Sequence, residues 1–370
     1  MAEKTRNATR DYASLSGTPW ILWEALYKRK SHRKYRRDVL PPGLAARLDE
    51  IIGLSTRVRG AREGSVRAFT GEGSVERIKT GCRKGALNKI NFWVARTNPS
   101  GFLLMEVPKE DLSRDRPEVL PVASLVMEDA VLWLAEQGLG SCWLGGVNQK
   151  ELSGEAGAVT GSTVPIAVPF GTPSQNTAPD FDSRGRAVLA RPRKRLSSIA
   201  FLETMETPYE PGDIEADRFD APEVQDVGGL LEQIGEGSGA PGRSDVPPGL
   251  AVEACFEAGR VAPSAGNSQP WSFIAVRDPK RLEALEQGCG TSGWELAIVV
   301  VAQASSWRST LAERPFWMID GPISLSHISL MAASTGSAVE VFISGFDERA
   351  LAEAIRGREG NRAVGVAFMR

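Results

Sequence analysis

The chain has 370 residues, of which 42% are hydrophobic and 24% charged, and its formal net charge is −2. This length favours two domains, and the nearly balanced charge gives no general attraction to nucleic acids or to anionic membranes. No apolar run reaches the ~18 residues that span a bilayer, and residues 1–20 lack the apolar stretch of a signal peptide, so we expect a cytoplasmic protein.

The first predicted helix lies in the stretch DVLPPGLAARLDEIIG, where Leu44, Leu48 and Ile51 recur at helical spacing and form one apolar face. A second helical pattern lies in MEDAVLWLAEQGLGSCWLGG, residues 127–146, and ends at Gly138. The stretches VNQKELSGEAG and TVPIAVPFGTP come next. They predict a short helix and then an apolar strand.

The same succession recurs later in the chain. DVPPGLAVEACFEAG matches the first helix with a shift that pairs Leu44 with Leu250, and SHISLMAASTGSAVEVFISG repeats the second pattern and stops at Gly336. FDERALAEAIRG and RAVGVAFMR then repeat the short helix and the strand. The repeat predicts two copies of one α+β unit, with chance similarity between amphipathic helices as the alternative.

Two linker-like stretches separate the copies. METPYEPGDIEADRFDAPEV is acidic and contains proline, and GEGSGAPGRSD is rich in Gly and Ser. We therefore expect a first unit over residues 20–201, a linker over 202–245 and a second unit over 246–370.

Cysteine and histidine usage argues against a metal site. The four cysteines have no CxxC spacing, which favours reduced thiols. His32 and His327 are the two histidines, and they lie far apart without a cluster of other ligands, so neither a zinc site nor a histidine-based triad is expected. We expect His327 to be a packed or surface residue, and the chemistry to belong to a bound organic cofactor.

Four polar or glycine-rich runs carry a family resemblance. YKRKSHRKY (27–35) and APSAGNSQPWSF (262–273) resemble the signature segments of the flavin-dependent nitroreductase family, and GLGSCWLGG (138–146) and RPRKRL (191–196) are similar to its later segments. The resemblance covers nearly the whole chain, once per half. It implies a tandem-duplicated member of that family: two α+β units, each with a mostly antiparallel central sheet flanked by helices, that form an intramolecular pseudo-dimer.

The cofactor implied by the resemblance is FMN. Arginine forks and a serine hydroxyl suit its phosphate, and a turn of small residues lets the backbone approach a flat ring while Ser and Asn supply hydrogen bonds. No catalytic residue and no metal ligand is identified. The expected cofactor-binding residues are Arg29, Lys30, Ser31, Arg33, Asn88, Gly145, Gly146, Arg193, Arg195, Pro263, Ser264, Ala265, Asn267 and Gln269.

Each half keeps only part of such a site. The first half has Arg57, Val58, Ala61 and Glu63 where the second has Pro263, Ser264, Asn267 and Gln269. The second half in turn has GEGSGAPG in place of the basic stretch and no copy of ARPRKRL. Because ordinary family members bind the flavin at a dimer interface, we expect one composite site between the halves of a monomer. The alternatives are that the basic run is a solvated surface and that Ser264 and Asn267 belong to an ordinary turn.

The resemblance implies an oxidoreductase that passes hydride from NAD(P)H to a small electron-poor acceptor such as a nitroaromatic, quinone or enone. No GxGxxG follows a strand, so no separate nicotinamide domain is expected, and ping-pong exchange in one pocket fits that absence. Neither nucleic acid nor a membrane is an expected partner. Two alternatives remain: a flavin-binding or redox-sensing protein without turnover, and an enzyme of the same fold with another reaction.

Overall fold

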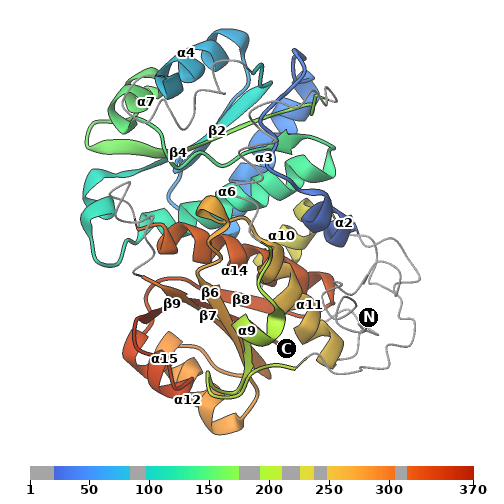
Figure 1. Ribbon diagram of the computed structural model, residues 1–370, viewed down its shortest axis with the longest axis vertical. Helices are drawn as coiled ribbons and strands as arrows, with labels where there is room; N and C mark the ends of the chain where they lie inside the picture. The colour runs from blue at the N-terminus through green and yellow to red at the C-terminus, as the bar shows by residue number, and fades with distance from the viewer. Residues whose placement is uncertain (1–20, 84–96, 175–191, 211–225, 237–247, 305–314) are drawn as a thin grey trace.

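The computed structural model describes residues 21–83, 97–174, 192–210, 226–236, 248–304 and 315–370. These residues form two β-sheets separated and flanked by helices, which confirms the mixed α+β class (Figure 1). The sheets lie at the top and the bottom of Figure 1, and helices α6 (Val119–Glu136) and α14 (Trp317–Ser334) lie between them. The largest apolar core fills this space between the sheets.

The first sheet has the strand order β1-β2-β4-β3, and all of its pairs are antiparallel. Its strands are β1 (Val66–Phe69), β2 (Gly101–Pro108), β3 (Gly140–Ser141) and β4 (Ser162–Gly171). Helices α4 (Glu72–Arg83) and α7 (Gln149–Ala156) pack on its outer face, and α3 (Pro42–Val58) packs with α6 on the inner side. Both faces are covered, so β4 is buried along its whole length.

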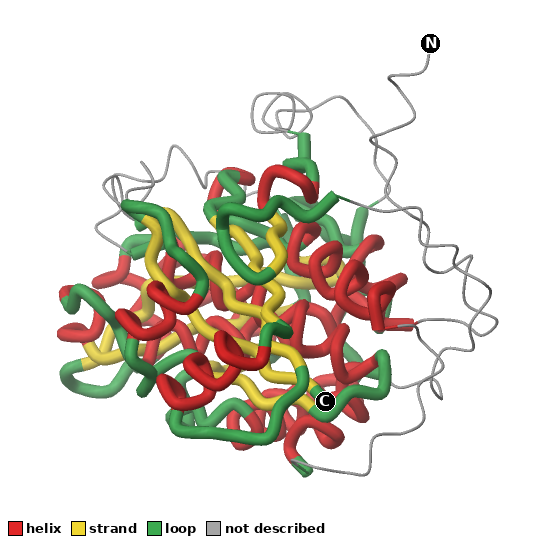
Figure 2. The backbone as a smooth tube through the Cα atoms, turned by 90° about the horizontal axis from the view of Figure 1, so that it is seen from below, coloured by secondary structure: helices red, strands yellow, loops and turns green. Residues whose placement is uncertain are grey.

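The second sheet has the order β5-β6-β7-β9-β8. Its strands are β5 (Ala200–Leu202), β6 (Trp271–Val276), β7 (Leu296–Gln303), β8 (Val339–Phe342) and β9 (Asn361–Met369). Only β5 is parallel to its neighbour, β6. Helices α12 (Pro279–Cys289) and α15 (Glu348–Ala354) cover the outer face, and α11 (Pro248–Val261) lies with α14 on the inner one (Figure 1). Figure 2 shows helices, in red, on both sides of the yellow strands.

The two sheets are built from the same succession of elements. The order α3-β1-α4-β2-α6-β3-α7-β4 recurs as α11-β6-α12-β7-α14-β8-α15-β9, and the strand order of the first sheet recurs in the second as β6-β7-β9-β8. Both short helix and strand pairs that the sequence predicts are present. The remaining described elements are α2 (Ile21–Lys28), a 3-10 turn (Lys109–Ser113), α9 (Leu196–Ile199), β5, α10 (Val227–Gly235) and a 3-10 turn (Ala265–Asn267).

The part of the chain between the repeats is more structured than a linker pattern indicates. Within residues 202–245, α10 packs against α3, α6 and α14. The segment that carries β5 pairs with β6, so the end of the expected first unit contributes a strand to the second sheet.

Helices α6 and α14 are buried on all sides, as expected for helices that are apolar around their whole circumference. Each nevertheless carries charged or titratable side chains: Glu128 and Asp129 on α6, and Asp320 and His327 on α14. A charged group in such a position needs a partner, because burying it without one is strongly unfavourable. Each of these four side chains is therefore expected to have a polar partner inside the protein.

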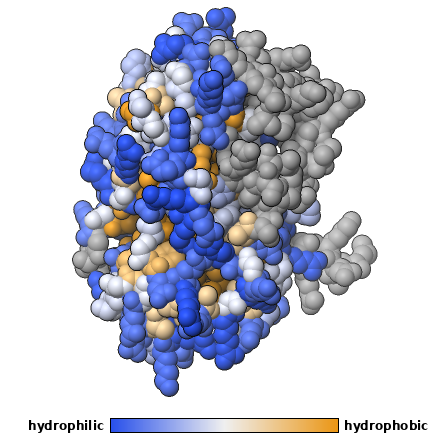
Figure 3. All heavy atoms as spheres, turned by 90° about the vertical axis from the view of Figure 1, so that its left-hand side faces the viewer, coloured by the Kyte–Doolittle hydropathy of each residue, from blue (hydrophilic) through white to orange (hydrophobic). Residues whose placement is uncertain are grey.

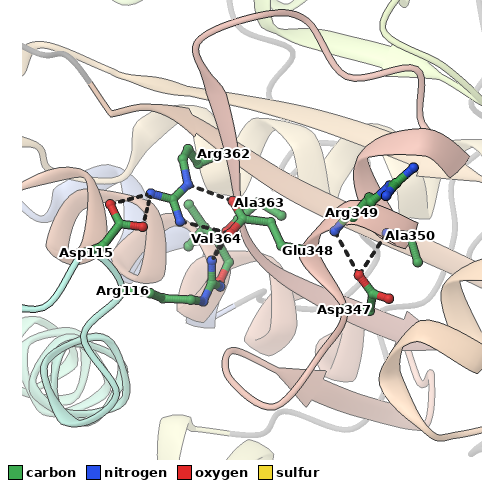
Figure 4. A network of polar contacts seen from close by, with 9 residues as sticks. All are labelled: Asp115, Arg116, Asp347, Glu348, Arg349, Ala350, Arg362, Ala363 and Val364. Atoms are coloured by element: carbon green, nitrogen blue, oxygen red, sulfur yellow. Dashed lines mark hydrogen bonds and ion pairs between the residues drawn. The ribbon is translucent and has the colours of Figure 1, made fainter.

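An ion cluster also joins the two halves nearer the surface (Figure 4). Arg362 of β9 donates to Asp115 at 2.9 Å and to Glu348 of α15 at 2.8 Å. Arg116 donates to Glu348 at 3.3 Å and to the carbonyl of Ala363 at 2.9 Å. The loop before α6 is thus tied to the start of β9 and to α15.

The visible surface is mainly polar. Figure 3 shows hydrophilic side chains over most of one face, with apolar atoms mostly in the hollows between them. Of the large hydrophobic side chains that the structure describes, only Val39, Val159 and Leu202 are exposed. Among these described residues, no helix combines the length and the apolar character that crossing a membrane requires.

Candidate cofactor site

The basic stretch predicted as a phosphate clamp begins directly after α2. The apolar face of this helix is buried through Leu22 and Leu26, which anchors the chain before Arg29. Ser31 then forms a β-bridge with Ser141 of β3, and the N–H of His32 donates to the Ser141 carbonyl at 2.9 Å. The stretch therefore runs beside the strand that leads to Gly145 and Gly146.

Arg29 has a side-chain nitrogen that lacks a hydrogen-bonding partner among the described residues. This atom is Nε, and it is buried. Burial lowers the pKa of the Arg29 guanidinium, while the nearby Glu128 carboxylate and Cys142 act in the opposite direction. A buried donor left unpaired is unfavourable, so an anion placed against Arg29 would be strongly stabilised.

Arg193 lies close to Arg29 and holds the end of α11. Its guanidinium donates to the carbonyls of Val261 at 2.8 Å and Ala262 at 2.6 Å. Burial, together with the charges of Arg29 and Arg260, lowers the pKa of Arg193 to about 10. A cation at a helix C-terminus interacts favourably with the helix dipole, so Arg193 has a structural role besides its contribution to the local positive charge.

Arg260 is the third arginine of a cluster with Arg29 and Arg193, and it forms an ion pair with a carboxylate. This carboxylate belongs to Glu257, one turn earlier on α11. Burial lowers the pKa of Arg260, but the hydrogen bond and charge of Glu257 outweigh that effect and leave the pKa raised. Tyr27 of α2 donates to Glu257 at 2.7 Å, which links the two halves at this point. The cluster keeps an excess of positive charge on the side of Arg29.

The turn between α11 and β6 has an unusual backbone. Asn267 and Gln269 both have positive φ values, 54° and 49°, and Gly266 between α11 and Asn267 has 57°. Non-glycine residues adopt this conformation uncommonly, Asn more often than most, and backbone strain of this kind concentrates at functional sites. Asp320 of α14 provides one restraint, because its carboxylate accepts from the N–H of Ala265 at 3.0 Å. Ser264 provides another by accepting from the N–H of Gln269 at 2.9 Å.

The tail of the first half provides the third restraint. The N–H of Lys194 donates to Oε1 of Gln269 at 2.7 Å, and its Nζ donates to the Gln269 carbonyl at the same distance. Nε2 of Gln269 donates to the carbonyl of Pro192 at 3.2 Å. Two segments that the sequence singled out separately, RPRKRL and PSAGNSQPW, are therefore in direct contact.

The positions of four other predicted residues give no direct indication of a ligand contact. Lys30 and Arg195 are exposed, and neither side chain forms a hydrogen bond within the described ranges, while Arg33 is half-buried. Gly145 faces the second half, since a Cβ there would lie 2.7 Å from the ring of Phe316. Asn88 lies outside the described residues.

Sequence reasoning did not identify the most buried polar contact near Arg29. Glu128 accepts from Nε1 of Trp143 at 2.9 Å, and its other oxygen lies 2.8 Å from Nε2 of His327. Nδ1 of His327 lies 3.0 Å from the carbonyl of Ala258 on α11. The side chains of Glu128 and His327 are fully buried. His327 is therefore a packed residue, which was one of the two positions expected from the sequence. Glu128 and Asp129, two adjacent acidic residues within an apolar stretch of α6, were the sequence signal that could have indicated it.

Comparisons with known proteins match this region. Residues 243–297, which include α11, the turn and β6, match the model of the Nitroreductase family. A protein of Archaeoglobus fulgidus, named as a candidate NADH dehydrogenase/NAD(P)H nitroreductase, is 36% identical over 91 residues, which are 23% of this chain and 49% of that protein. The chain thus spans about half the length of the curated relative it matches.

Similar solved structures carry related names. A candidate nitroreductase of Thermotoga maritima matches over 94% of this chain and 92% of its own, with 16% identity and a TM-score of 0.42. An FMN-dependent nitroreductase of Clostridium difficile matches over 44% of this chain and 93% of its own, with 19% identity and a TM-score of 0.32.

Proposed function

We propose that this chain, which is a nitroreductase family protein, is an FMN-dependent oxidoreductase with one composite flavin site between its two halves. The observation that carries the proposal is the buried Nε of Arg29, which has no hydrogen-bonding partner among the described residues and lies on a guanidinium close to Arg193. The strained turn at Asn267 would form the side of the flavin site opposite Arg29. The tail of the first half holds this turn through Lys194. Together these groups offer a cationic clamp and a rigid backbone edge.

The pseudo-dimer is supported by a reciprocal contact between α6 and α14. If the helix stops at Gly138 and Gly336 are aligned, Glu128 is equivalent to Ser326 and Asp129 to His327. Glu128 contacts His327 at 2.8 Å, and Ser326 donates to Asp129 at 2.6 Å. A twofold interface has this property, because residue i contacts j while j contacts i. We propose two units, residues 20–201 and 246–370, related in this way.

On the opposite side of this pseudo-twofold arrangement, Asp129 has partners within its own half. Arg59, at the C-terminal end of α3, is buried and donates to both carboxylate oxygens of Asp129, at 3.0 and 3.1 Å. Ser55 donates to the same carboxylate at 2.7 Å. The Asp129 carboxylate is therefore neutralised by a cation of the same half.

These residues fit FMN, because the buried and unpartnered Nε of Arg29 could donate a hydrogen bond to an anionic group. When bound, FMN supplies hydride acceptance from NAD(P)H and donation to an electron-poor acceptor. Arg29 and Ser31 would hold the phosphate, and Arg193 would add positive charge while fixing the end of α11. Ser264 and Asn267 would border the ring, held in place by Asp320 and Lys194.

A titration of the purified full-length protein with FMN tests the proposal. We expect saturation at one FMN per chain, with a change in the visible absorbance of the flavin, followed by NADH or NADPH oxidation when menadione is added. Initial rates should follow a ping-pong pattern, since one pocket would serve both substrates in turn. Binding of two flavins would contradict the composite site. Flavin binding without turnover would identify a binding or sensing protein, and no binding would overturn the proposal.

A further inference from the structure

The hydrogen-bond geometry around His327 determines where its protons lie. Nδ1 faces the carbonyl of Ala258 at 3.0 Å, and a backbone carbonyl can only accept, so Nδ1 must carry a hydrogen. Nε2 faces Oε1 of Glu128 at 2.8 Å. A second proton must therefore lie between Nε2 and the carboxyl group, either on the ring or on Glu128.

The surroundings of Glu128 favour placing this proton on the ring. Its Oε2 already accepts from the indole N–H of Trp143 at 2.9 Å, and the charge of Arg29 lies nearby. Donors and a neighbouring cation both stabilise the carboxylate over the neutral acid. Asp129, the other acid on this turn of α6, is directed toward Arg59 and Ser326 instead. These contacts favour an imidazolium at His327 paired with a carboxylate at Glu128.

This pairing has a consequence for Arg29. Both oxygens of Glu128 are engaged by N–H donors, at Trp143 and His327, so the carboxylate influences Arg29 electrostatically without forming a hydrogen bond to it. Loss of the imidazolium charge would leave an uncompensated buried carboxylate, whose strongest available partner is Arg29. The guanidinium would then be drawn away from any external anion.

We propose that His327 is a positioning residue: held as an imidazolium, this residue of the second half occupies Glu128 and so leaves Arg29 of the first half available to an anionic ligand. The assignment of that ligand as the FMN phosphate rests on the proposed function. The protonation of His327 does not.

The first experiment examines the ring directly, without a ligand. The chain has only two histidines, so 15N-histidine labelling of the full-length protein gives a simple spectrum, and a His32→Gln variant leaves His327 alone. At neutral pH we expect both nitrogens of His327 to show one-bond coupling to a proton. A ring with one bare nitrogen would overturn the proposal.

The second experiment measures binding of FMN and of riboflavin, which lacks the phosphate. In His327→Gln, a side chain that keeps an N–H donor but not the charge, we expect FMN affinity to fall about tenfold and riboflavin affinity to change less than about twofold. Adding Glu128→Gln in the same chain removes the uncompensated carboxylate and should restore FMN affinity to within about threefold of the original protein.

Ser326→Ala is the matched control, because it removes a buried interface hydrogen bond to Asp129 next to His327 but leaves Glu128 untouched. It should retain the preference for FMN over riboflavin. An equal loss in Ser326→Ala, or no rescue in the double variant, would contradict the link to Arg29. If the original protein bound neither flavin, the proposed function would fail, whereas the ring protonation would still be decided by the labelled spectra.

Discussion

Lys194 donates two hydrogen bonds to Gln269 across the halves of the protein, each 2.7 Å long: its backbone N–H donates to Oε1 of Gln269, and its Nζ donates to the Gln269 carbonyl. Gln269 has a φ of 49°, a conformation that needs such restraint. The turn that precedes β6 is therefore shaped by a segment some seventy-five residues earlier in the chain.

The first prediction concerns this contact. Gln269→Ala should lower the free energy of unfolding by about 1–3 kcal/mol, because it leaves the N–H of Lys194 and the carbonyl of Pro192 without their buried partner. FMN affinity should also fall, since the turn loses its restraint. Urea unfolding and flavin titration measure the two effects. Gln287→Ala, at an exposed position of α12, should change stability by less than about 0.5 kcal/mol.

Removing Arg29 should separate ligand binding from stability. Arg29→Ala should weaken FMN binding roughly ten- to hundredfold, the range expected for a lost charge-assisted hydrogen bond, with little effect on riboflavin. The ligand-free variant should be at least as stable as the original protein, because the substitution removes a buried Nε that has no partner in the described part of the chain. The exposed Arg195→Ala provides the comparison. Equal losses in both variants would point to general electrostatic attraction.

The buried Arg59–Asp129 pair should be important for stability. Arg59→Ala leaves the Asp129 carboxylate buried with only serine donors and should lower the free energy of unfolding by about 3–5 kcal/mol. Circular dichroism during urea unfolding measures the change. Arg57→Ala, two residues earlier and exposed, should have almost no effect. A small effect of Arg59→Ala would mean that the halves do not pack around this pair.

Glu348 should contribute to stability above mildly acidic pH. Its hydrogen bond from Arg362, and the charge of Arg116, lower its pKa in the folded protein. The contribution is therefore complete above the pKa of the unfolded chain and is lost as the pH falls through the lower folded value. Glu348→Gln should remove up to about 1 kcal/mol of this acid-sensitive stability, a small value because the group is partly exposed. Thermal unfolding across acidic buffers, with Glu353→Gln as control, checks it.

Glu136 should act in the opposite direction. Burial, with the charge of Asp226, raises its pKa to about 8, against the effect of the hydrogen bond from the N–H of Val227. Between the ordinary carboxyl value of 4.5 and about 8, the folded protein holds a proton that the unfolded chain has released. Stability should therefore fall as the pH rises through this window and change no further above it.

Glu136→Gln should flatten that slope, and the exposed Glu236→Gln should not. Unfolding midpoints in a series of buffers give the slopes directly. An unchanged slope in Glu136→Gln would show that this carboxyl ionises normally at the start of α10.

The sequence by itself determined the local features of this protein. The apolar spacing and the glycine stops predicted α3, α6, α7, α14 and α15, the helix and strand order predicted the repeat of elements, and the polar turn and basic run pointed to the nitroreductase family. These features depend on neighbours a few residues apart, so periodicity and turn chemistry are sufficient to reveal them.

Only the tertiary structure decided which side chains meet. His327 and Glu128 are 199 residues apart in the chain, and their contact depends on how α6 packs against α14. The attachment of Arg193 to the end of α11, the addition of β5 to the second sheet and the packing of Phe316 on Gly145 have the same origin. No local pattern encodes them, because a buried polar group is satisfied by whichever partner the packing of distant helices brings within hydrogen-bonding distance.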